Sequence, residues 1–325
     1  MAKPSDSLAE RLLVEQLDKN SYTSKCLPLR MGNSAPISYG GFQLGVAINA
    51  ASISVRPDHY LYSVTGYYLG PVSTEQKITC TIEELRNTRT FSTRQVRVTQ
   101  TGRLCLLLTA DFRTSEAALL TYDPLPFRKY SHWSECKPSE ERKQEALENG
   151  TITTKQAEIY EFFFSSGTQY WDVRPCPEGI FAQNFSGVAK DVQTTQQDAP
   201  LSDKTSGEWY RIKSDLKGRE QHMAALGFLL DAGLSFLPLS HSNLFLDDAG
   251  PCSSLDFALR VFVDDVDMNQ WHLVERRSLC GSLGLTHTIA NMFGESGRLV
   301  AQMSQQSILR PKPAEQEKGE RKEKL

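Results

Sequence analysis

The sequence predicts an α+β protein built from two copies of one unit, in each of which a curved antiparallel sheet wraps around a central helix. Two observations predict this fold class. A helical segment rich in small and apolar residues is followed by four strand-like segments, and this order occurs twice. In addition, Val72 lies 30 residues before Gly102 in "TGRLCLL", and Val266 lies 31 residues before Gly297 in "SGRLVAQ". An internal duplication of this kind indicates two related supersecondary units in one chain.

The length supports this division, because 325 residues are enough for about two domains of 100 to 200 residues each. We place the first unit, with an N-terminal helix, at residues 1–123 and the second unit at residues 217–310. A connecting segment over residues 124–216 separates them. The proline-flanked, charged end of the chain, residues 311–325, is expected to be a disordered tail.

The first unit begins with a capping-box pattern at Ser7 to Glu10, which predicts a short helix. The run "SYGGFQLGVAINAASISV" predicts the central helix, and Gly40 and Gly41 at its start would let it lie close to a sheet or another backbone. Alternation of apolar and polar residues, clearest from Phe91 to Val98, predicts strands after this helix. The four strand-like segments are residues 59–72, 77–88, 90–100 and 103–113.

The connecting segment is polar overall, with a candidate polar helix at residues 139–150, but six aromatic residues lie between Tyr160 and Arg174. We interpret it as a long connection that partly covers a sheet. In the second unit, the run "HMAALGFLLDAGLSFLP" predicts one buried helix over residues 222–238. The strand-like segments that follow are residues 253–266, 270–281, 285–295 and 298–309.

Composition argues against several classes of partner. The net charge is -3, so there is no basic field that would favour nucleic acid or an anionic membrane surface. No apolar run has the length of a signal peptide or a membrane span, which predicts an intracellular protein. The C-terminal Glu323-Lys324-Leu325 is similar to a peroxisomal address, with Glu where a small residue is wanted, so both peroxisomal and cytoplasmic locations stay open.

Seven cysteines without a C-x-x-C pair are typical of a reducing compartment and are interpreted as core thiols. We find no Gly-rich phosphate loop and no metal-ligand spacing of His and Cys, so neither a cofactor nor a metal is expected. The motif closest to a nucleophile elbow, "CGSLG" at residues 280–284, has Cys in place of the first glycine and lies between two predicted strands. It therefore does not favour a serine hydrolase.

Asp231 is the most unusual residue of the predicted buried helix, because an ionised carboxylate in an apolar run is costly unless it is paired or used. It could simply cap a loop or face solvent. Alternatively, Ser254 at the start of the next strand and Gln305 in the last strand could converge on it, since strand residues of one parity face the helix. Asp231 would then accept a proton from a water whose direction Gln305 and Ser254 fix.

These segments resemble the type II acyl-coenzyme A (acyl-CoA) thioesterases, a family with a double hotdog fold in which two hotdog units form a pseudo-dimer. The resemblance rests on "SYGGFQLGVAINAA", "LYSVTGYYLGPV" and "LRNTRTFSTRQVRVTQTGR" in the first unit, and on "LGFLLDAGLSFLP", "SSLDFALRVF", "NQWHLVE" and "GRLVAQMSQQSILR" in the second. It implies hydrolysis of acyl-CoA to a free acid and CoA without a cofactor. It leaves acyl length and homo-oligomer formation open.

The resemblance also implies roles for particular residues. The family's water-positioning Asp, Thr and Gln fall on Asp231, Ser254 and Gln305, with Ser253 as the alternative hydroxyl if the register slips by one. The start of the first central helix would polarise the thioester carbonyl through backbone N–H groups near Gly40 and Gly41.

The chain departs from the family pattern at two places. "LRNTRTF" replaces the family's Asp-Gly-x-Ser-Phe and brings in Arg89, and Thr65 replaces a His. These departures leave open a binding or scaffold protein that has lost turnover. A hotdog dehydratase would need Asp and His in one active-site segment, but no His follows His222 in the predicted helix, which disfavours that activity.

Overall fold

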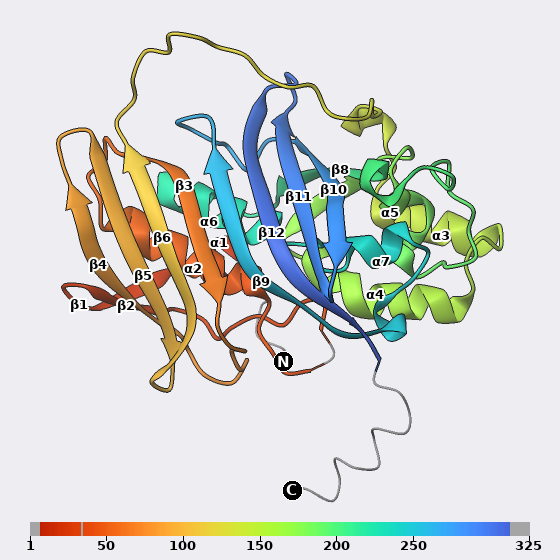
Figure 1. Ribbon diagram of the computed structural model, residues 1–325, viewed down its shortest axis with the longest axis horizontal. Coiled ribbons are helices and arrows are strands. Elements are labelled where there is room, and N and C mark those ends of the chain that lie inside the picture. The colour runs from red at the N-terminus through yellow and green to blue at the C-terminus, as the bar shows by residue number, and fades with distance from the viewer. Residues whose placement is uncertain (1–6, 34, 313–325) are drawn as a thin grey trace, which may run out of the picture.

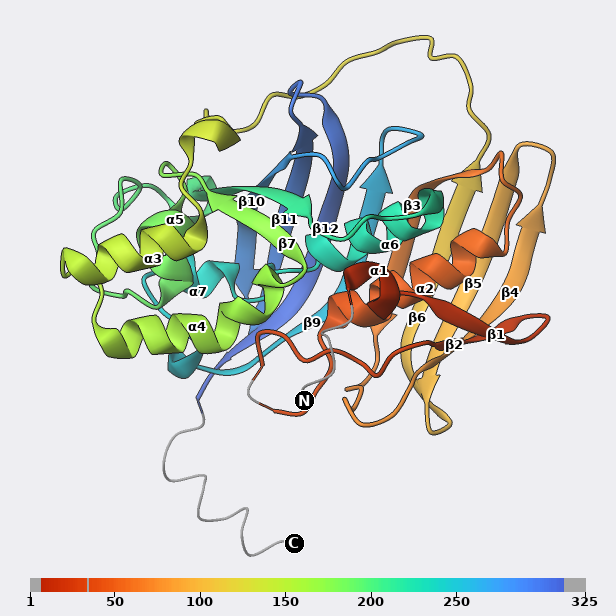
Figure 2. The ribbon, with the colours of Figure 1, turned by 180° about the vertical axis from the view of Figure 1, so that it is seen from behind.

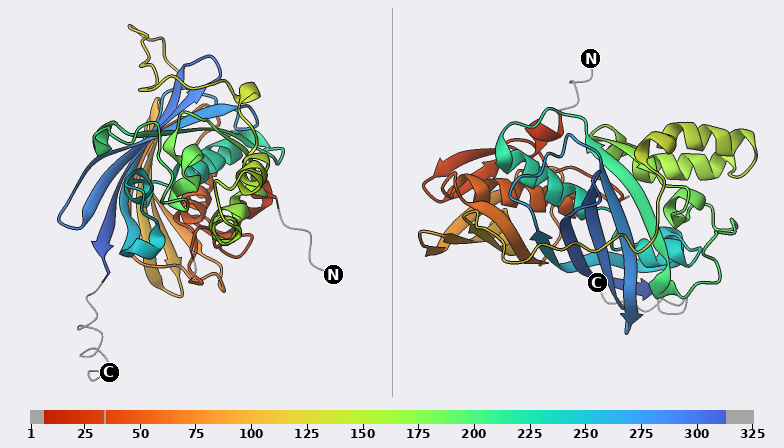
Figure 3. Two further views of the ribbon diagram at one scale, coloured as in Figure 1. Left: turned by 90° about the vertical axis from the view of Figure 1, so that its right-hand side faces the viewer. Right: turned by 90° about the horizontal axis from the view of Figure 1, so that it is seen from above.

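The computed structural model of the protein describes residues 7–33 and 35–312. Twelve strands form one antiparallel sheet in the order β1-β2-β4-β5-β6-β3-β9-β12-β11-β10-β8-β7 (Figure 1). The sheet curves around two helices, α2 and α6, which lie side by side on one of its faces (Figures 2 and 3). The two predicted sheets thus meet edge to edge and enclose one core.

The first unit contains the predicted helices and strands. Ser7 caps α1 with Glu10 in a capping box, as the sequence predicts, and α2 begins at Gly40. The hairpin β1–β2, which pairs with β4 at the outer edge of the sheet, was not predicted. The elements are α1 (Leu8–Arg11), β1 (Val14–Asp18), β2 (Ser21–Ser24), α2 (Gly40–Ile53), β3 (Tyr60–Tyr68), β4 (Thr79–Asn87), β5 (Phe91–Gln100) and β6 (Arg103–Arg113).

The second unit repeats this order, and strand β3 of the first unit pairs with β9 of the second, for example through Val64 and Leu259. This pairing joins the two halves of the sheet, while α2 packs on α6 through small residues. A Cβ at Gly45 would lie 2.9 Å from the carbonyl oxygen of Ala224, so only glycine permits this approach. The elements are α6 (Gly218–Leu230), α7 (Leu237–His241), η4 (Leu246–Asp248), β9 (Ala249–Val261), β10 (His272–Ser282), β11 (Leu285–Gly294) and β12 (Leu299–Pro311).

The central helix of the second unit is shorter than the sequence predicts. It ends at Leu230, Asp231 is its C-cap residue, and a separate helix begins at Leu237. The prediction of one helix over residues 222–238 was wrong because Gly233 takes the left-handed conformation, with φ of +86°, that commonly ends helices. Asp231 therefore lies at the end of the helix and not in its middle.

The connecting segment was predicted to cover part of a sheet, but it also adds strands to the sheet. Its polar helix is confirmed as α3, and two of its strands, β7 and β8, extend the sheet beside β10. The first part of the aromatic run forms α4 (Figure 1). Its Tyr160 and Phe163 pack against Phe185 and Phe245 in a separate apolar cluster. The elements are η1 (Trp133–Glu135), α3 (Ser139–Glu148), α4 (Thr154–Thr168), β7 (Trp171–Pro175), α5 (Ile180–Gln183), η2 (Phe185–Gly187), η3 (Leu201–Asp203) and β8 (Thr205–Ile212).

All seven cysteines are free, but the interpretation as core thiols holds only in part. Cys80, Cys105, Cys136 and Cys176 are buried, whereas Cys280 is exposed in the β10–β11 hairpin. Within residues 7–33 and 35–312, no helix is long and apolar enough to cross a membrane. The tail expected to be disordered lies, from residue 313 on, outside the described residues.

Candidate active site

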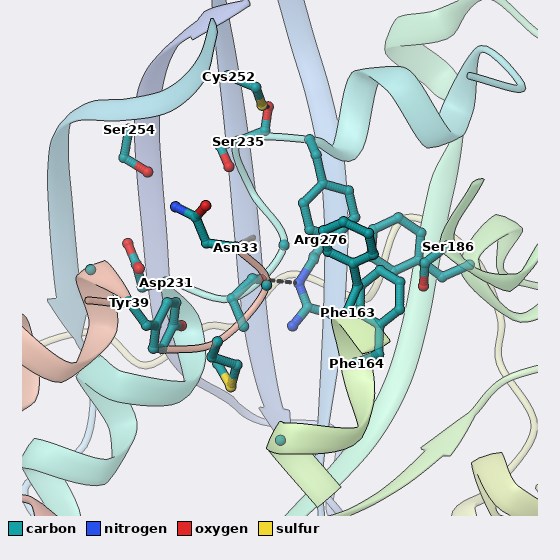
Figure 4. A pocket seen from close by; sticks show the side chains of 18 of the residues that line it. Asn33, Tyr39, Phe163, Phe164, Ser186, Asp231, Ser235, Cys252, Ser254 and Arg276 are labelled. Carbon is teal, nitrogen blue, oxygen red and sulfur yellow. Dashed lines mark hydrogen bonds between the residues drawn. The ribbon is translucent and has the colours of Figure 1, made fainter. Parts of the chain in front are cut away.

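A cavity of about 250 Å³ lies where the first unit, the second unit and the connecting segment meet (Figure 4). The segment before α2 and the first turn of that helix form one side, and the turn after α6 with the start of β9 forms another. Helix α4 and strands β8 and β10 complete the wall. The lining includes Asn33, Tyr39, Gly40, Phe163, Phe164, Asp231, Cys252, Ser253, Ser254 and Arg276.

Asp231 lies in this wall and is only 6% exposed. Its Oδ1 accepts a hydrogen bond of 2.8 Å from Gln305 Nε2 and one of 3.0 Å from the Tyr68 hydroxyl. The three side chains come from α6, β12 and β3, so both units hold the carboxylate in place. Two donors on one oxygen fix the orientation of the carboxylate and leave Oδ2 on the side of Gly40.

Burial raises the pKa of the Asp231 carboxyl to about 6. Hydrogen bonds from Tyr68, from Gln305 and from the backbone N–H of Gly41 act in the opposite direction, because they stabilise the ionised form. The result is a carboxylate that is mostly ionised at pH 7 yet basic enough to take up a proton. This balance suits a general base that works near neutral pH.

Gln305 is completely buried, in agreement with the strand parity that the sequence suggested. It lies on β12 opposite Phe257 of β9, with its side chain directed to the helices. Ser307 donates a hydrogen bond of 3.4 Å to Oε1 of Gln305, while Nε2 is used by Asp231. The orientation of the amide is therefore determined from both ends.

Ser254 lines the same cavity as Asp231, and Figure 4 places the two side chains on the same side of it. The described residues show no hydrogen bond from Ser254 to Asp231 or Gln305. A bulge in the β9–β12 pairing, between Asp256 and Ser254, shifts the register at this point. Ser253 also lines the cavity but is exposed. The structure thus brings Asp231 and Gln305 into contact and places Ser254 near them.

Gly40 and Gly41 lie at the first turn of α2, directly against the carboxylate. A Cβ at Gly40 would lie 2.9 Å from Asp231 Oδ2, and a Cβ at Gly41 would lie 2.6 Å from the carbonyl oxygen of Phe228. Both positions therefore require glycine. The backbone N–H of Gly41 also favours the ionised form of Asp231, which places this turn beside the carboxylate.

Tyr68 is a site residue that the sequence analysis missed. On β3 the buried positions Val64 and Gly66 have the same parity as Tyr68, whereas Thr65 and Tyr67 are exposed on the opposite face. The parity of this strand could have identified Tyr68. Tyr39 was missed too, and its hydroxyl donates to the carbonyl oxygen of Phe228 over 2.7 Å, which ties the start of α2 to α6.

The two departures from the family pattern lie away from this cavity. Thr65 is exposed on the outer face of the sheet. The β4–β5 hairpin that carries Arg89 lies at the C-terminal end of α2, where Arg94 donates to the carbonyl oxygen of Ser54. A helix of 14 residues is about 20 Å long, so this end is far from Gly40. Neither departure therefore removes a group from the cavity.

The residues that the structure describes contain no group of three His, Cys, Asp or Glu side chains that could hold a metal ion.

Comparison with known proteins agrees with this architecture. Residues 27–113 match the model of the acyl-CoA thioesterase N-terminal domain, and residues 166–309 match that of the C-terminal domain. Acyl-CoA thioesterase 2 of Haemophilus influenzae is 22% identical over 84% of this chain and 87% of its own length.

Solved structures show the same fold. The acyl-CoA thioesterase II TesB2 of Mycobacterium marinum superposes with a TM-score of 0.68 at 21% identity, covering 94% of this chain and 99% of that one. The tesB protein of Mycobacterium avium subs paratuberculosis gives 0.69 at 16% identity, covering 94% and 98%. The two domain matches together span more than two thirds of the sequence, in the order of the two hotdog units, and the chain therefore belongs to the type II acyl-CoA thioesterases, a family of thioester hydrolases.

Proposed function

We propose that the protein hydrolyses acyl-CoA to a free acid and CoA by means of one water molecule that Asp231, Gln305 and Ser254 position. The observation that carries this proposal is the buried carboxylate of Asp231, which two side chains hold at the wall of a cavity. A carboxylate in this setting can accept a proton, and no serine or cysteine activated by a neighbouring base competes with it among the lining residues.

In the proposed reaction, Asp231 takes a proton from the water, and the water oxygen attacks the carbonyl carbon of the thioester. The Gln305 amide and the Ser254 hydroxyl direct the water. The tetrahedral intermediate then loses the CoA sulfur, which leaves as the thiol after taking the proton back from Asp231. One water is consumed and one thiol is released, so the carboxylate returns to its initial state.

The negative charge on the carbonyl oxygen needs a donor in this reaction. The N-terminus of α2 supplies backbone N–H groups and the positive end of a 14-residue helix at the cavity wall. We assign the carbonyl oxygen to the backbone N–H groups of Gly40 and Gly41 in this turn.

The main alternative is a protein that binds acyl-CoA without turning it over. It was suggested by Arg89 and Thr65, but both lie outside the cavity, so the structure gives no reason to expect lost turnover. The alternative predicts saturable binding of acyl-CoA without product.

Thiol release from a medium-chain acyl-CoA tests the proposal. Asp231→Ala should lower the rate at least ~100-fold, the lower range for removing a positioned base. Asp265→Asn, which changes an exposed carboxylate, serves as the control and should keep the full rate. Cys280 is a free, exposed thiol, and the assay is run in a Cys280→Ser background so that a thiol reagent reports released CoA. Full activity in Asp231→Ala would reject the assignment.

A further inference from the structure

A buried ion pair lies in the wall of the active-site cavity, and the proposed hydrolysis does not use it. Arg276 Nη1 on β10 donates to Glu208 Oε2 on β8 over 2.7 Å, and their side chains are only 1% and 9% exposed. The Tyr210 hydroxyl donates to the same carboxylate oxygen over 2.7 Å. Arg276 Nε donates to the carbonyl oxygen of Ala232 over 3.0 Å, one residue after Asp231.

Such a pair is costly in the wall of a cavity that only has to hold an alkyl chain. Replacing a buried ion pair by apolar residues of similar size is often neutral or stabilising. Both members of the pair also have hydrogen-bonding groups that their contacts within the protein do not use. Glu208 Oε1 receives no hydrogen bond from any residue of the described parts of the chain, and a guanidinium carries five N–H donors, more than the contacts seen here employ.

The position of the pair indicates which part of a thioester it would meet. Gly32, Asn33 and Ser253 are exposed lining residues and mark the mouth of the cavity. Glu208 and Arg276 are buried, and Figure 4 shows Arg276 beside the aromatic rings of α4. The large, charged CoA moiety stays at the mouth, because a cavity of about 250 Å³ cannot enclose it. The acyl group therefore extends toward the pair.

We propose that Glu208 and Arg276 form a subsite for a hydroxyl group on the acyl chain, so that the preferred substrates are hydroxyacyl thioesters. This inference rests on the proposed thioesterase function. A hydroxyl both donates and accepts, which matches a carboxylate oxygen and a guanidinium side by side. A carboxylate on the acyl chain would instead face the negative charge of Glu208. Because Arg276 contacts the residue after Asp231, the hydroxyl is expected near the thioester end of the chain.

The test compares thiol release from acyl-CoA substrates of one chain length that carry no substituent, a hydroxyl at successive carbons, or a terminal carboxylate. The wild-type protein should favour one hydroxyl isomer over the plain acyl group about 10-fold or more in kcat/KM, the scale of hydrogen bonds to charged groups. The double variant Glu208→Gln with Arg276→Met should bring this ratio close to one. Changing both residues avoids leaving one buried charge unpaired.

Arg277→Met is the matched control, because Arg277 is the next residue on β10, points to the opposite face and stacks on Phe127. It should keep the wild-type ratio. If the double variant does not fold, Tyr210→Phe, which removes one donor to Glu208, takes its place and should lower the ratio.

A wild-type ratio near one at every hydroxyl position, or a preference for the carboxylate-bearing chain, would overturn the subsite while the thioesterase function stood. Absence of thiol release from every substrate would overturn both.

Discussion

Gln305 donates through Nε2 to Asp231 Oδ1 over 2.8 Å, and this bond joins the last strand of the sheet to the end of a helix 74 residues earlier in the chain. The bond is direct and buried, and of the two residues Asp231 lines the cavity while Gln305 lies behind it. The bond stabilises the ionised carboxylate and determines which oxygen faces the cavity. Loss of this bond should therefore change both the rate of thioester hydrolysis and the pH range over which that rate rises.

Replacing Gln305 tests this relationship. Gln305→Leu should lower kcat at least ~10-fold, because the carboxylate and the attacking water lose a positioning partner. Gln305→Glu should lower activity further at neutral pH, since a second carboxylate raises the pKa of Asp231. Gln306→Leu, on the opposite face of β12, is the control and should behave as wild type. Equal activity of Gln305→Leu and Gln306→Leu in a thiol-release assay would contradict this role.

Tyr68→Phe should move the pH dependence of the reaction. In the wild-type protein, kcat/KM should rise with pH around pH 6, as the Asp231 carboxyl ionises, and then level off. The Tyr68 hydroxyl lowers the pKa of Asp231, so its removal should shift this rise to higher pH, by about 1 pH unit if the bond contributes about 1.4 kcal/mol. A purely structural role would lower kcat without moving the profile. Tyr67→Phe, exposed on the other face, is the control.

The two serines at the start of β9 can be distinguished by substitution. Ser254→Ala should lower kcat about 10-fold through loss of a group that directs the water, and Ser254→Thr should retain activity because the hydroxyl remains. Ser253→Ala should have little effect, since that residue is exposed. If Ser253→Ala lowered kcat and Ser254→Ala did not, the hydroxyl that directs the water would be that of Ser253.

Much of this arrangement could be predicted from the sequence, because it depends on periodicity. The parity of β12 placed Gln305 on the inner face, and the small residues of α2 and α6 indicated close helix packing. The end of α6 at Asp231 was missed, because apolar residues continue beyond it and only the φ of Gly233 reveals the turn. The Glu208 and Arg276 pair could not be predicted, since it depends on β8, a strand that the sequence analysis placed in a connection.

Gly40→Ala tests the contact between α2 and the catalytic carboxylate. The new methyl group would lie 2.9 Å from Asp231 Oδ2, so the carboxylate must move away from the position that its two donors define. We expect kcat to fall about 100-fold, the scale of a small misplacement of a catalytic group. Gly281→Ala, where a Cβ meets nothing closer than 3.4 Å, is the control and should retain activity. Wild-type kcat in Gly40→Ala would show that this contact does not matter.

Asp231 should also reduce the stability of the folded protein at neutral pH. Its pKa rises from 3.8 to about 6 on folding, so the folded state holds the proton more tightly than the unfolded state does. Below pH 3.8 the carboxyl is protonated in both states and costs nothing. The cost develops between pH 3.8 and 6 and is complete above pH 6, where it amounts to about 3 kcal/mol.

Asp231→Asn should therefore raise the free energy of unfolding at pH 8 while abolishing activity, and this gain should disappear near pH 4. Denaturant unfolding at both pH values measures the difference, with Asp265→Asn as the exposed control. A gain of equal size at pH 4 and pH 8 would mean that packing, and not the charge of Asp231, is responsible. A loss of stability at pH 8 would mean that the hydrogen bonds from Gln305 and Tyr68 more than compensate for burial of the charge. The expected outcome is a protein that gives up stability to keep an ionised base in its core.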